Sequence, residues 1–333
     1  MAGSTILYLT KADVLECLPP VERRLELADY AMASLANGNC LMPPKPELMT
    51  RVEPEGAFHA LPAFFRDRDI AGCKWSCTFA ANPPRGLPSV SALIILSDPD
   101  TGFPLCVMDG TLVTAHRTAA VSGVSIKRMA PRRVGKVAIW GAGFQARTHL
   151  EVLCATIPGF PLWVYDSDAA RLEDYAAWAG EQAGVSEVHK GGSVAETLQG
   201  ADVAITATTV HNPGDPYVVP GMLGTDCLLL PLEWNLQVPA STAKEASLFL
   251  VDDRAEFTYY RDQADRLAMV AFKDYPDPHE TIGEAVARCL SRETRPDGLI
   301  VSCALGTGAA DVSAASEVYQ NARKRAVGTT LAL

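Results

Sequence analysis

The stretch Val134-Gly-Lys-Val-Ala-Ile-Trp140, followed by Gly141-Ala-Gly-Phe-Gln-Ala146, decides the fold class of this 333-residue chain. An apolar run that ends in Gly-x-Gly-x-x-Ala is typical of a β-strand that turns into a helix beneath a bound dinucleotide. Gly141 permits the tight turn, Gly143 lets the backbone approach a pyrophosphate, and Ala146 lets the helix pack closely on the strand. The motif alone is weak, because Gly-Ala-Gly also occurs in ordinary strand-to-helix turns.

An acidic residue after the next apolar run, Pro161-Leu-Trp-Val-Tyr165, strengthens the dinucleotide interpretation. Asp166 follows Gly141 by 25 residues, close to the separation at which a carboxylate binds the adenosine ribose hydroxyls. A carboxylate at this place favours NAD over NADP, because it repels the additional phosphate of NADP. The alternative is a solvated Asp at the end of a strand in an ordinary α/β domain.

Short apolar runs alternate with amphipathic stretches from Val134 onward, which is typical of a parallel, doubly wound sheet. We therefore predict an α/β protein with a Rossmann domain over residues 131–305. The expected strands are 134–140, 162–166, 202–207, 227–230, 248–252 and 299–304, and the expected helices are 145–155, 169–183 and 193–198.

The residues before Val134 show a different pattern. An amphipathic stretch over 11–36 precedes several strand-like runs, and two of these, 90–96 and 105–107, flank the turn signal Asp98-Pro-Asp-Thr-Gly102. We expect an α+β domain with antiparallel strands over residues 1–130. The last stretch, 308–333, reads as a helix that returns to this domain, which would comprise 1–130 plus 306–333.

Composition excludes several classes of protein. The net charge of −10 and the pI near 5.1 disfavour nucleic acid as a partner, because binding to phosphates draws on clustered Lys and Arg. No apolar run is long enough to span a membrane, and the N-terminus does not resemble a secretory signal, so we expect a cytoplasmic protein. Nine scattered cysteines without a CxxC pair predict neither a disulfide framework nor a metal site.

Three cations of the first half are candidates for binding a substrate: Lys45, Lys74 and Arg117. Lys74 and Arg117 lie among apolar and small residues, where an unpaired charge is costly. Each requires an anionic partner. The partner is either a substrate carboxylate or a local acidic residue, such as Asp109 for Arg117.

One acidic residue of the second half is a candidate for proton transfer. Glu233 follows the apolar run Leu228-Leu-Leu-Pro-Leu232, at the end of a predicted strand where α/β sheets bind their ligands. A carboxyl group there can exchange a proton with a substrate amine. The alternative is an ordinary Glu in a loop or at the start of a helix.

Six segments together resemble the ornithine cyclodeaminase/μ-crystallin family, and the resemblance covers nearly the whole chain. The Arg-Thr-Ala-Ala-Val-Ser sequence that begins at Arg117 is its most diagnostic part. The segments are Met42-Pro-Pro-Lys45, Gly72-Cys-Lys-Trp75, the runs 86–95 and 101–110, Thr114-Ala-His-Arg-Thr-Ala-Ala-Val-Ser122, and Gly141-Ala-Gly-Phe-Gln-Ala146.

This resemblance implies a substrate and dimerisation domain beside the Rossmann domain, a homodimer, and hydride transfer between a nicotinamide and the α-carbon of an amino acid or imino acid. Lys74 and Arg117 would hold the substrate carboxylate, with Lys74 also near the reacting nitrogen. Lys45 occupies a position where the family commonly has Arg or Lys. The residues assigned to the cofactor site are Thr118, Gly141, Gly143, Phe144, Gln145, Ala146, Asp166, Thr206 and Thr208.

The chain departs from the family pattern at Pro231-Leu-Glu-Trp-Asn235. Cyclodeaminases of the family typically have Gly-x-Asp-x-Pro-Gly-Lys there, with the Asp serving the substrate amines, and Glu233 would align with that Asp. We therefore predict an NAD-dependent oxidoreductase that acts on a carbon–nitrogen bond, with Lys74 and Glu233 as the catalytic residues. A cyclodeaminase that recycles its NAD and releases ammonia, and a non-catalytic nucleotide- or ligand-binding protein, are the alternatives.

Overall fold

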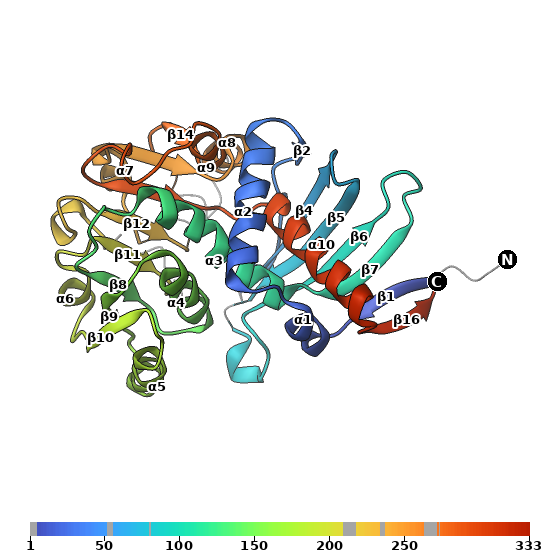
Figure 1. Ribbon diagram of the computed structural model, residues 1–333, viewed down its shortest axis with the longest axis horizontal. Coiled ribbons are helices and arrows are strands. Elements are labelled where there is room, and N and C mark those ends of the chain that lie inside the picture. The colour runs from blue at the N-terminus through green and yellow to red at the C-terminus, as the bar shows by residue number, and fades with distance from the viewer. Residues whose placement is uncertain are drawn as a thin grey trace. The chain divides into compact units, whose positions relative to one another are not determined.

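The computed structural model describes residues 5–51, 56–79, 81–208, 218–233, 237–262, 272 and 274–333. The chain divides into two compact units (Figure 1). The first unit is Met1–Thr118 with Gly306–Leu333, and the second is Ala119–Leu305. The division falls within helix α3 (Gly110–Met129) and again just before helix α10 (Gly308–Arg325).

The described strands of the first unit form one mixed sheet in the order β16-β1-β7-β6-β5-β4-β2, with β3 also paired to β4. β1 runs parallel to β7, and the other pairs are antiparallel. The strands are β1 (Thr5–Leu9), β2 (Cys40–Leu41), β3 (Glu47–Arg51), β4 (Gly56–Phe65), β5 (Ile70–Thr78), β6 (Val90–Ser97), β7 (Pro104–Asp109) and β16 (Thr329–Ala332).

The hairpin expected around Asp98 is confirmed as β6 and β7. The carbonyl oxygen of Asp98 accepts a hydrogen bond from Gly102 N at 2.8 Å, and its carboxylate accepts one from Thr101 N at 2.8 Å. Gly102 has a φ of 70°, in the left-handed region that glycine adopts without a steric penalty. The turn residues therefore set the register of the two strands.

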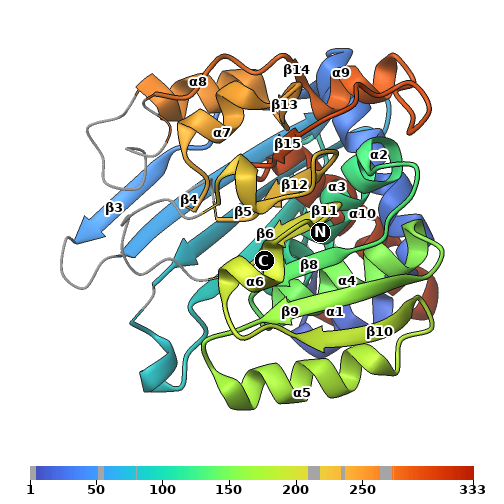
Figure 2. The ribbon, with the colours of Figure 1, turned by 90° about the vertical axis from the view of Figure 1, so that its left-hand side faces the viewer.

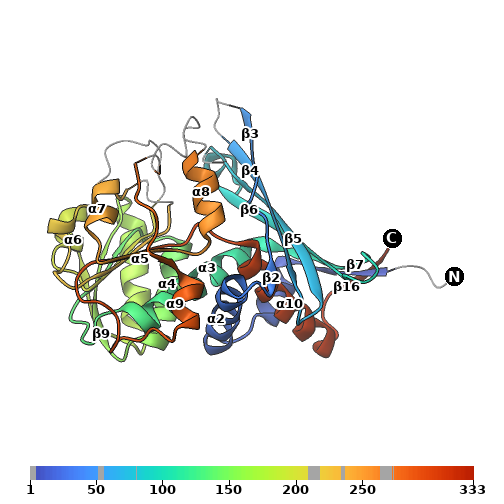
Figure 3. The same cartoon turned by 90° about the horizontal axis from the view of Figure 1, so that it is seen from above.

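The amphipathic stretch 11–36 forms two helices, α1 (Lys11–Cys17) and α2 (Val21–Ala36), because Pro19 and Pro20 interrupt the helical hydrogen bonding. Helix α10 contacts α2 and lies across strands β4, β5 and β6 (Figure 3). The sheet has an inner face with buried residues such as Ile94 and Met108. Its opposite face exposes Trp75 and Leu93. The strict alternation follows from the two-residue period of a strand.

The described strands of the second unit form a parallel sheet in the order β10-β9-β8-β11-β12-β15-β13-β14. This is the doubly wound, Rossmann-like sheet that the sequence predicts. The strands are β8 (Val137–Trp140), β9 (Phe160–Tyr165), β10 (Val185–Lys190), β11 (Val203–Thr206), β12 (Leu228–Pro231), β13 (Leu248–Val251), β14 (Glu280–Thr281) and β15 (Ile300–Cys303).

Two of these strands, β10 and β14, were not expected from the sequence. β10 is an edge strand whose sequence Val-Ser-Glu-Val-His-Lys has no residue in the buried class, so it lacks the apolar run of a central strand. β14 has two residues, too few to show any period. β10 thus escaped prediction because an edge strand needs less burial than the strands inside the sheet, and β14 because it is too short.

Six α-helices are described in the second unit, and Figure 2 shows α5 along the β9–β10 edge of the sheet. Asp168 caps α5, since its carboxylate accepts hydrogen bonds from Ala170 N at 3.0 Å and Arg171 N at 3.1 Å. Within the described ranges, no helix combines the length and apolarity that crossing a bilayer requires. The helices are α4 (Phe144–Thr156), α5 (Ala169–Gly180), α6 (Val194–Leu198), α7 (Ala240–Glu245), α8 (Arg254–Asp262) and α9 (Ile282–Ala287).

Candidate active site

The glycine motif forms the turn between β8 and α4. Gly141 N donates a hydrogen bond to Tyr165 O at 2.8 Å, and Ala207 N donates one to Trp140 O at 2.7 Å. Gly141 has a φ of 110°, and a Cβ atom there would lie 2.4 Å from the carbonyl oxygen of Ala207. Only glycine fits this position, because both the backbone conformation and the neighbouring strand exclude a side chain.

The space around Gly143 suits a phosphate group. Gly143 is the N-cap of α4 and supplies no side-chain cap, and a Cβ atom there would meet nothing within 4 Å. The space beside Gly143 is therefore open at the start of α4, and the first amide groups of a helix are able to bind pyrophosphate. Phe144 is 51 % exposed, whereas Ala146 is fully buried. These residues fit a dinucleotide, of which Gly143 and the start of α4 would hold the pyrophosphate.

Asp166 lies directly after β9, beside this turn. Its Oδ2 accepts a hydrogen bond from Ala142 N at 2.8 Å, and its Oδ1 accepts one from Asp168 N at 2.9 Å. Arg171 Nη1 lies 3.3 Å from Oδ1 of Asp166, and Arg171 Nη2 lies 3.3 Å from Asp168. The carboxylate is thus fixed at the strand end where the ribose hydroxyls of a dinucleotide bind.

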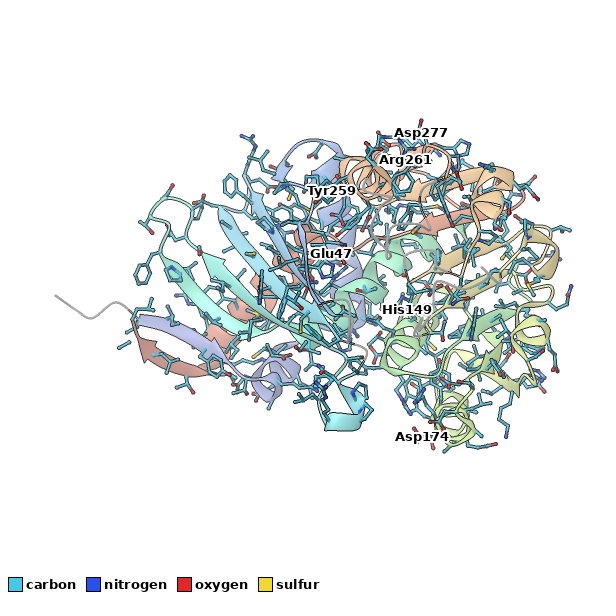
Figure 4. All side chains as sticks on the ribbon, turned by 180° about the vertical axis from the view of Figure 1, so that it is seen from behind. Glu47, His149, Asp174, Tyr259, Arg261 and Asp277 are labelled. Atoms are coloured by element: carbon cyan, nitrogen blue, oxygen red, sulfur yellow. The ribbon has the colours of Figure 1, made fainter. Side chains whose placement is uncertain are left out.

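The remaining residues assigned to the cofactor site lie in different places. The backbone nitrogen of Thr208 lies 3.1 Å from the position that a Cβ of Gly141 would take. Gln145 O contacts the ring of His149 at 2.7 Å, and His149 is labelled in Figure 4. Thr118 belongs to the first unit, where its hydroxyl donates to Thr114 O at 2.7 Å. Their roles toward a cofactor stay predictions.

Glu233 lies beyond the end of β12, and Thr206 ends the neighbouring strand β11. The register places Thr206 opposite Pro231, and the Thr206 hydroxyl donates a hydrogen bond to Glu233 Oε1 at 2.5 Å. The other carboxyl oxygen, Oε2, is buried and accepts no hydrogen bond from the described residues. Burial raises the pKa of Glu233 to about 8, against the opposing effect of the Thr206 hydrogen bond. Glu233 can therefore hold or release a proton near neutral pH.

Lys74 and Arg117 meet at one carboxylate in the first unit. Lys74 Nζ, on β5, lies 3.0 Å from Oδ1 and 2.8 Å from Oδ2 of Asp311, and Arg117 Nε, on α3, donates to Oδ1 at 2.8 Å. Lys74 is 2 % exposed, Arg117 8 % and Asp311 0 %. Asp109, the local partner considered for Arg117, instead accepts a hydrogen bond from Leu112 N at 3.1 Å at the start of α3.

Asp311 is the residue of this cluster that the sequence analysis missed. It lies on α10, 194 residues from Arg117 and 237 from Lys74, so no local spacing connects them. A signal was nevertheless present, since Asp311 is the single charged residue in Gly306-Thr-Gly-Ala-Ala-Asp-Val-Ser-Ala-Ala-Ser316. A charge in such a run of small and apolar residues requires a partner when the helix is buried.

Lys45 and His59 lie in the same cluster. Lys45 Nζ donates a hydrogen bond to Gly306 O at 3.1 Å. Burial, followed by the nearby charges of Lys45 and Lys74, lowers the pKa of His59 to about 3. Burial and the charge of Arg117 lower the pKa of Lys74 to about 7, although Asp311 acts in the opposite direction. We refer to Lys45, Lys74, Arg117 and Asp311 as the cation cluster.

Comparisons with known proteins agree with the fold. Residues 9–326 match the model of the ornithine cyclodeaminase/mu-crystallin family. The alanine dehydrogenase of Archaeoglobus fulgidus is 30% identical over 331 residues, with 98% of each chain covered. The nodulation efficiency protein NfeD of Rhizobium meliloti is 29% identical, with 97% of each covered.

Two solved structures share the fold over almost the whole chain. The Thermococcus litoralis Δ(1)-pyrroline-2-carboxylate reductase, in complex with NADH and L-proline, has a TM-score of 0.83 and 25% identity, covering 97% of this chain and 99% of that one. An archaeal alanine dehydrogenase dimer with bound NAD has a TM-score of 0.81 and 27% identity, covering 98% and 99%. By the extent of the family match and the identity to these relatives, this chain belongs to the ornithine cyclodeaminase/mu-crystallin family.

Proposed function

We propose that this protein is an NAD-dependent oxidoreductase that acts on a carbon–nitrogen bond of an amino acid or imino acid. The observation that carries this proposal is the cation cluster, in which Lys74 and Arg117 share the single carboxylate of Asp311. One negative charge facing two buried cations favours a second anion, and a substrate carboxylate supplies it. Alanine dehydrogenase and Δ(1)-pyrroline-2-carboxylate reductase, the similar proteins named above, support the choice of substrate class.

Arg117 is suited to bind the substrate carboxylate. Its Nε contacts Asp311, while Nη1 and Nη2 make no hydrogen bond to any described residue. A guanidinium group offers these two atoms as a fork that matches the two oxygens of a carboxylate. Lys74 lies next to it and would hold the same carboxylate, with its amino group near the reacting nitrogen.

Glu233 would exchange the proton that the reaction requires. In imine reduction, the α-carbon gains a hydride and the nitrogen gains a proton, and amine oxidation reverses both transfers. When bound, the nicotinamide cofactor supplies or accepts the hydride. Burial raises the pKa of Glu233 to about 8, so the carboxyl group can donate the proton in one direction and accept it in the other near neutral pH.

Asp166 supports the choice of NAD over NADP. Its carboxylate is held by backbone amides of Ala142 and Asp168, at the position where it would repel the phosphate of NADP. Arg171, a side chain that could compensate that repulsion, is engaged by both Asp166 and Asp168. We therefore assign the ribose to Asp166.

We also propose that the protein is a homodimer formed through the outer face of the first unit's sheet. This face exposes Trp75, Leu93 and Ile95 at 47 %, 48 % and 43 %, and the register places Trp75 opposite Leu93 on neighbouring strands. Exposed apolar side chains in one patch are typical of an interface. The variant Trp75→Glu should elute as a monomer in size-exclusion chromatography with light scattering, where the unmodified protein elutes as a dimer. Equal masses would exclude this face.

A substrate screen tests the proposed activity. Amino acids are tested with NAD. Keto acids with ammonia or an amine, and cyclic imines, are tested with NADH. The absorbance of NADH is followed in every assay. A dehydrogenase or imine reductase changes the NADH concentration in proportion to product. Ammonia released without a net change of NADH would instead show a cyclodeaminase. No turnover in either direction, with function retained after substitution of both Lys74 and Arg117, would show a non-catalytic binding protein.

A further inference from the structure

Asp311 is held rigidly by the start of helix α10. The Thr307 hydroxyl caps the helix by accepting a hydrogen bond from Ala310 N at 3.3 Å. A Cβ atom on Gly308 would lie 2.7 Å from Pro62 O, so the first turn of α10 lies directly against β4. Asp311 is in that first turn, where the helix dipole also stabilises a negative charge. The carboxylate is thus a fixed point around which the cations are arranged.

Gly306 fixes the guanidinium of Arg117 from the other side. A Cβ atom there would lie 3.0 Å from both Nη1 and Nη2, and Gly306 has a φ of 91°. Because Gly306 has no side chain, the guanidinium of Arg117 can lie against its backbone. Asp311 thus holds Nε, while Nη1 and Nη2 lie beside Gly306.

The charges around Lys74 come from four elements. Asp311 faces it from α10 and Arg117 from α3, while Lys45 precedes β3 and His59 lies on β4. Asp311 is the only group among these that favours the protonated form of Lys74, because burial, Arg117 and Lys45 all lower its pKa. Removing the Asp311 charge would therefore favour a neutral Lys74.

We propose that Asp311 is a positioning residue, which keeps Lys74 charged and Arg117 oriented so that the pair can bind the carboxylate of an anionic substrate. Asp311 acts through the two cations and does not itself contact the substrate. This inference deepens the proposed function and depends on it for the identity of the anion. A merely structural Asp would leave the KM for the anionic substrate unchanged.

The variant Asp311→Asn tests the proposal, because the amide keeps the shape and removes the charge. The probe substrate is Δ1-pyrroline-2-carboxylate with NADH, or pyruvate with ammonium if the screen favours it. We expect KM for the probe to rise by about tenfold or more near pH 6, where Lys74 is protonated in the unmodified protein, the effect of losing one charge-assisted hydrogen bond. The ratio of the two KM values should shrink near pH 8, where Lys74 is largely neutral in the unmodified protein as well. Because only substrate binding is weakened, kcat should change by less than about threefold.

Two matched variants separate this effect from a loss of structure. Asp109→Asn removes a carboxylate that only contacts the start of α3, and should leave KM unchanged at both pH values. Gly306→Ala displaces the guanidinium but leaves the Asp311 charge, and should raise KM equally at both pH values. A KM for Asp311→Asn that is lower than that of the unmodified protein would overturn the proposal, because Asp311 would then compete with the substrate for the cations. An equal rise at both pH values would also overturn it.

The titration of Lys74 can be followed without turnover by NMR, because the amine is too buried for a labelling reagent. The protein is produced with 13C-labelled lysine, the Lys74 Cε signal is assigned with Lys74→Arg, and its chemical shift is followed across a pH series. The midpoint should move to lower pH in Asp311→Asn and stay in place in Asp109→Asn. An unmoved midpoint contradicts the proposal even if no substrate is found, whereas absent turnover with a moved midpoint contradicts only the proposed function.

Discussion

Two buried carboxyl groups, Asp311 in the first unit and Glu233 in the second, have opposite surroundings. Asp311 is fully buried and contacts both Lys74 and Arg117. Glu233 accepts one side-chain hydrogen bond, from the Thr206 hydroxyl to Oε1. Its other oxygen, Oε2, is buried and accepts no hydrogen bond from the described residues. The first carboxylate organises cations, while the second is pushed toward its protonated form. Both groups lose water on folding, and the partners decide which of them can carry a proton.

Burial shifts the pKa values of Lys74 and Glu233 in opposite directions, because it disfavours the charged form of each. Burial lowers the pKa of Lys74 to about 7 and raises the pKa of Glu233 to about 8. A cation and an acid that are ordinarily far apart in pKa therefore titrate near one another, close to neutral pH. In the proposed reaction the first regulates binding of an anion and the second transfers a proton.

The largest expected effect comes from breaking the cation cluster with Arg117→Met. We expect kcat/KM for the substrate identified in the screen to fall by about a thousandfold, the cost of removing one partner from a buried, hydrogen-bonded charge pair. Steady-state kinetics measures the loss. The control Arg288→Met removes an exposed arginine paired with Glu280 and should retain activity. A loss of less than about threefold in Arg117→Met would exclude Arg117 from substrate binding.

Glu233→Gln tests the other side of the comparison. If Glu233 transfers the proton, kcat should fall by about a hundredfold while KM changes little. The exposed Glu181→Gln should have no effect on either constant. An unchanged kcat would place the proton transfer elsewhere, and Lys74 would be the next residue to test.

The same variant has a consequence for stability. The pKa of Glu233 is about 8 in the folded protein, above its ordinary value of 4.5, so the folded state binds more protons between these values. The free energy of unfolding should therefore decrease as the pH rises from about 4.5 to 8, because the stability contributed by the protonated Glu233 is lost over this range. Glu233→Gln lacks the effect, so its Tm relative to the unmodified protein should increase across this window in thermal denaturation. A constant difference in Tm would contradict the raised pKa.

Asp166 is a third carboxylate to compare with Asp311 and Glu233. It accepts hydrogen bonds from two backbone amides and pairs with Arg171. Asp166→Ser should lower the preference for NAD over NADP by about tenfold to a hundredfold, because it removes a repulsion and releases Arg171 to bind a phosphate. The ratio of kcat/KM with the two cofactors measures the change. Adding Arg171→Ala should cancel the gain with NADP. An unchanged ratio in Asp166→Ser would remove Asp166 from cofactor selection.

The smallest effect is expected from Thr206→Val. The Thr206 hydroxyl is the one hydrogen bond among the described side chains that lowers the pKa of Glu233. Its removal should move the Glu233-dependent limb of the pH–rate profile to higher pH and change kcat by only about threefold, as expected for the loss of one hydrogen bond. A limb that stays in place would show that the limb belongs to another group.

Much of the fold could be predicted because it depends on local patterns. The apolar runs of the central strands, the turn at Gly102 and the glycines of the β8–α4 turn each carry their signal within a few residues. The two helices at 11–17 and 21–36 were read as one stretch, although the prolines between them mark the break. The edge strand β10 was missed because its polar sequence has no apolar run to detect.

The sequence by itself determined the family, the dinucleotide turn and the cations that require an anion. Gly141 could be identified because only glycine tolerates its backbone conformation and surroundings. Lys74 and Arg117 could be identified because a charge among apolar residues must be compensated. Only the tertiary structure decided which group compensates these two cations. Asp311 of α10 pairs with both, whereas Asp109, which is nearer to Arg117 in the sequence, contacts Leu112 N instead. The physical reason is that electrostatic pairing depends on distance in space, and chain folding brings α10 against the sheet that carries Lys74.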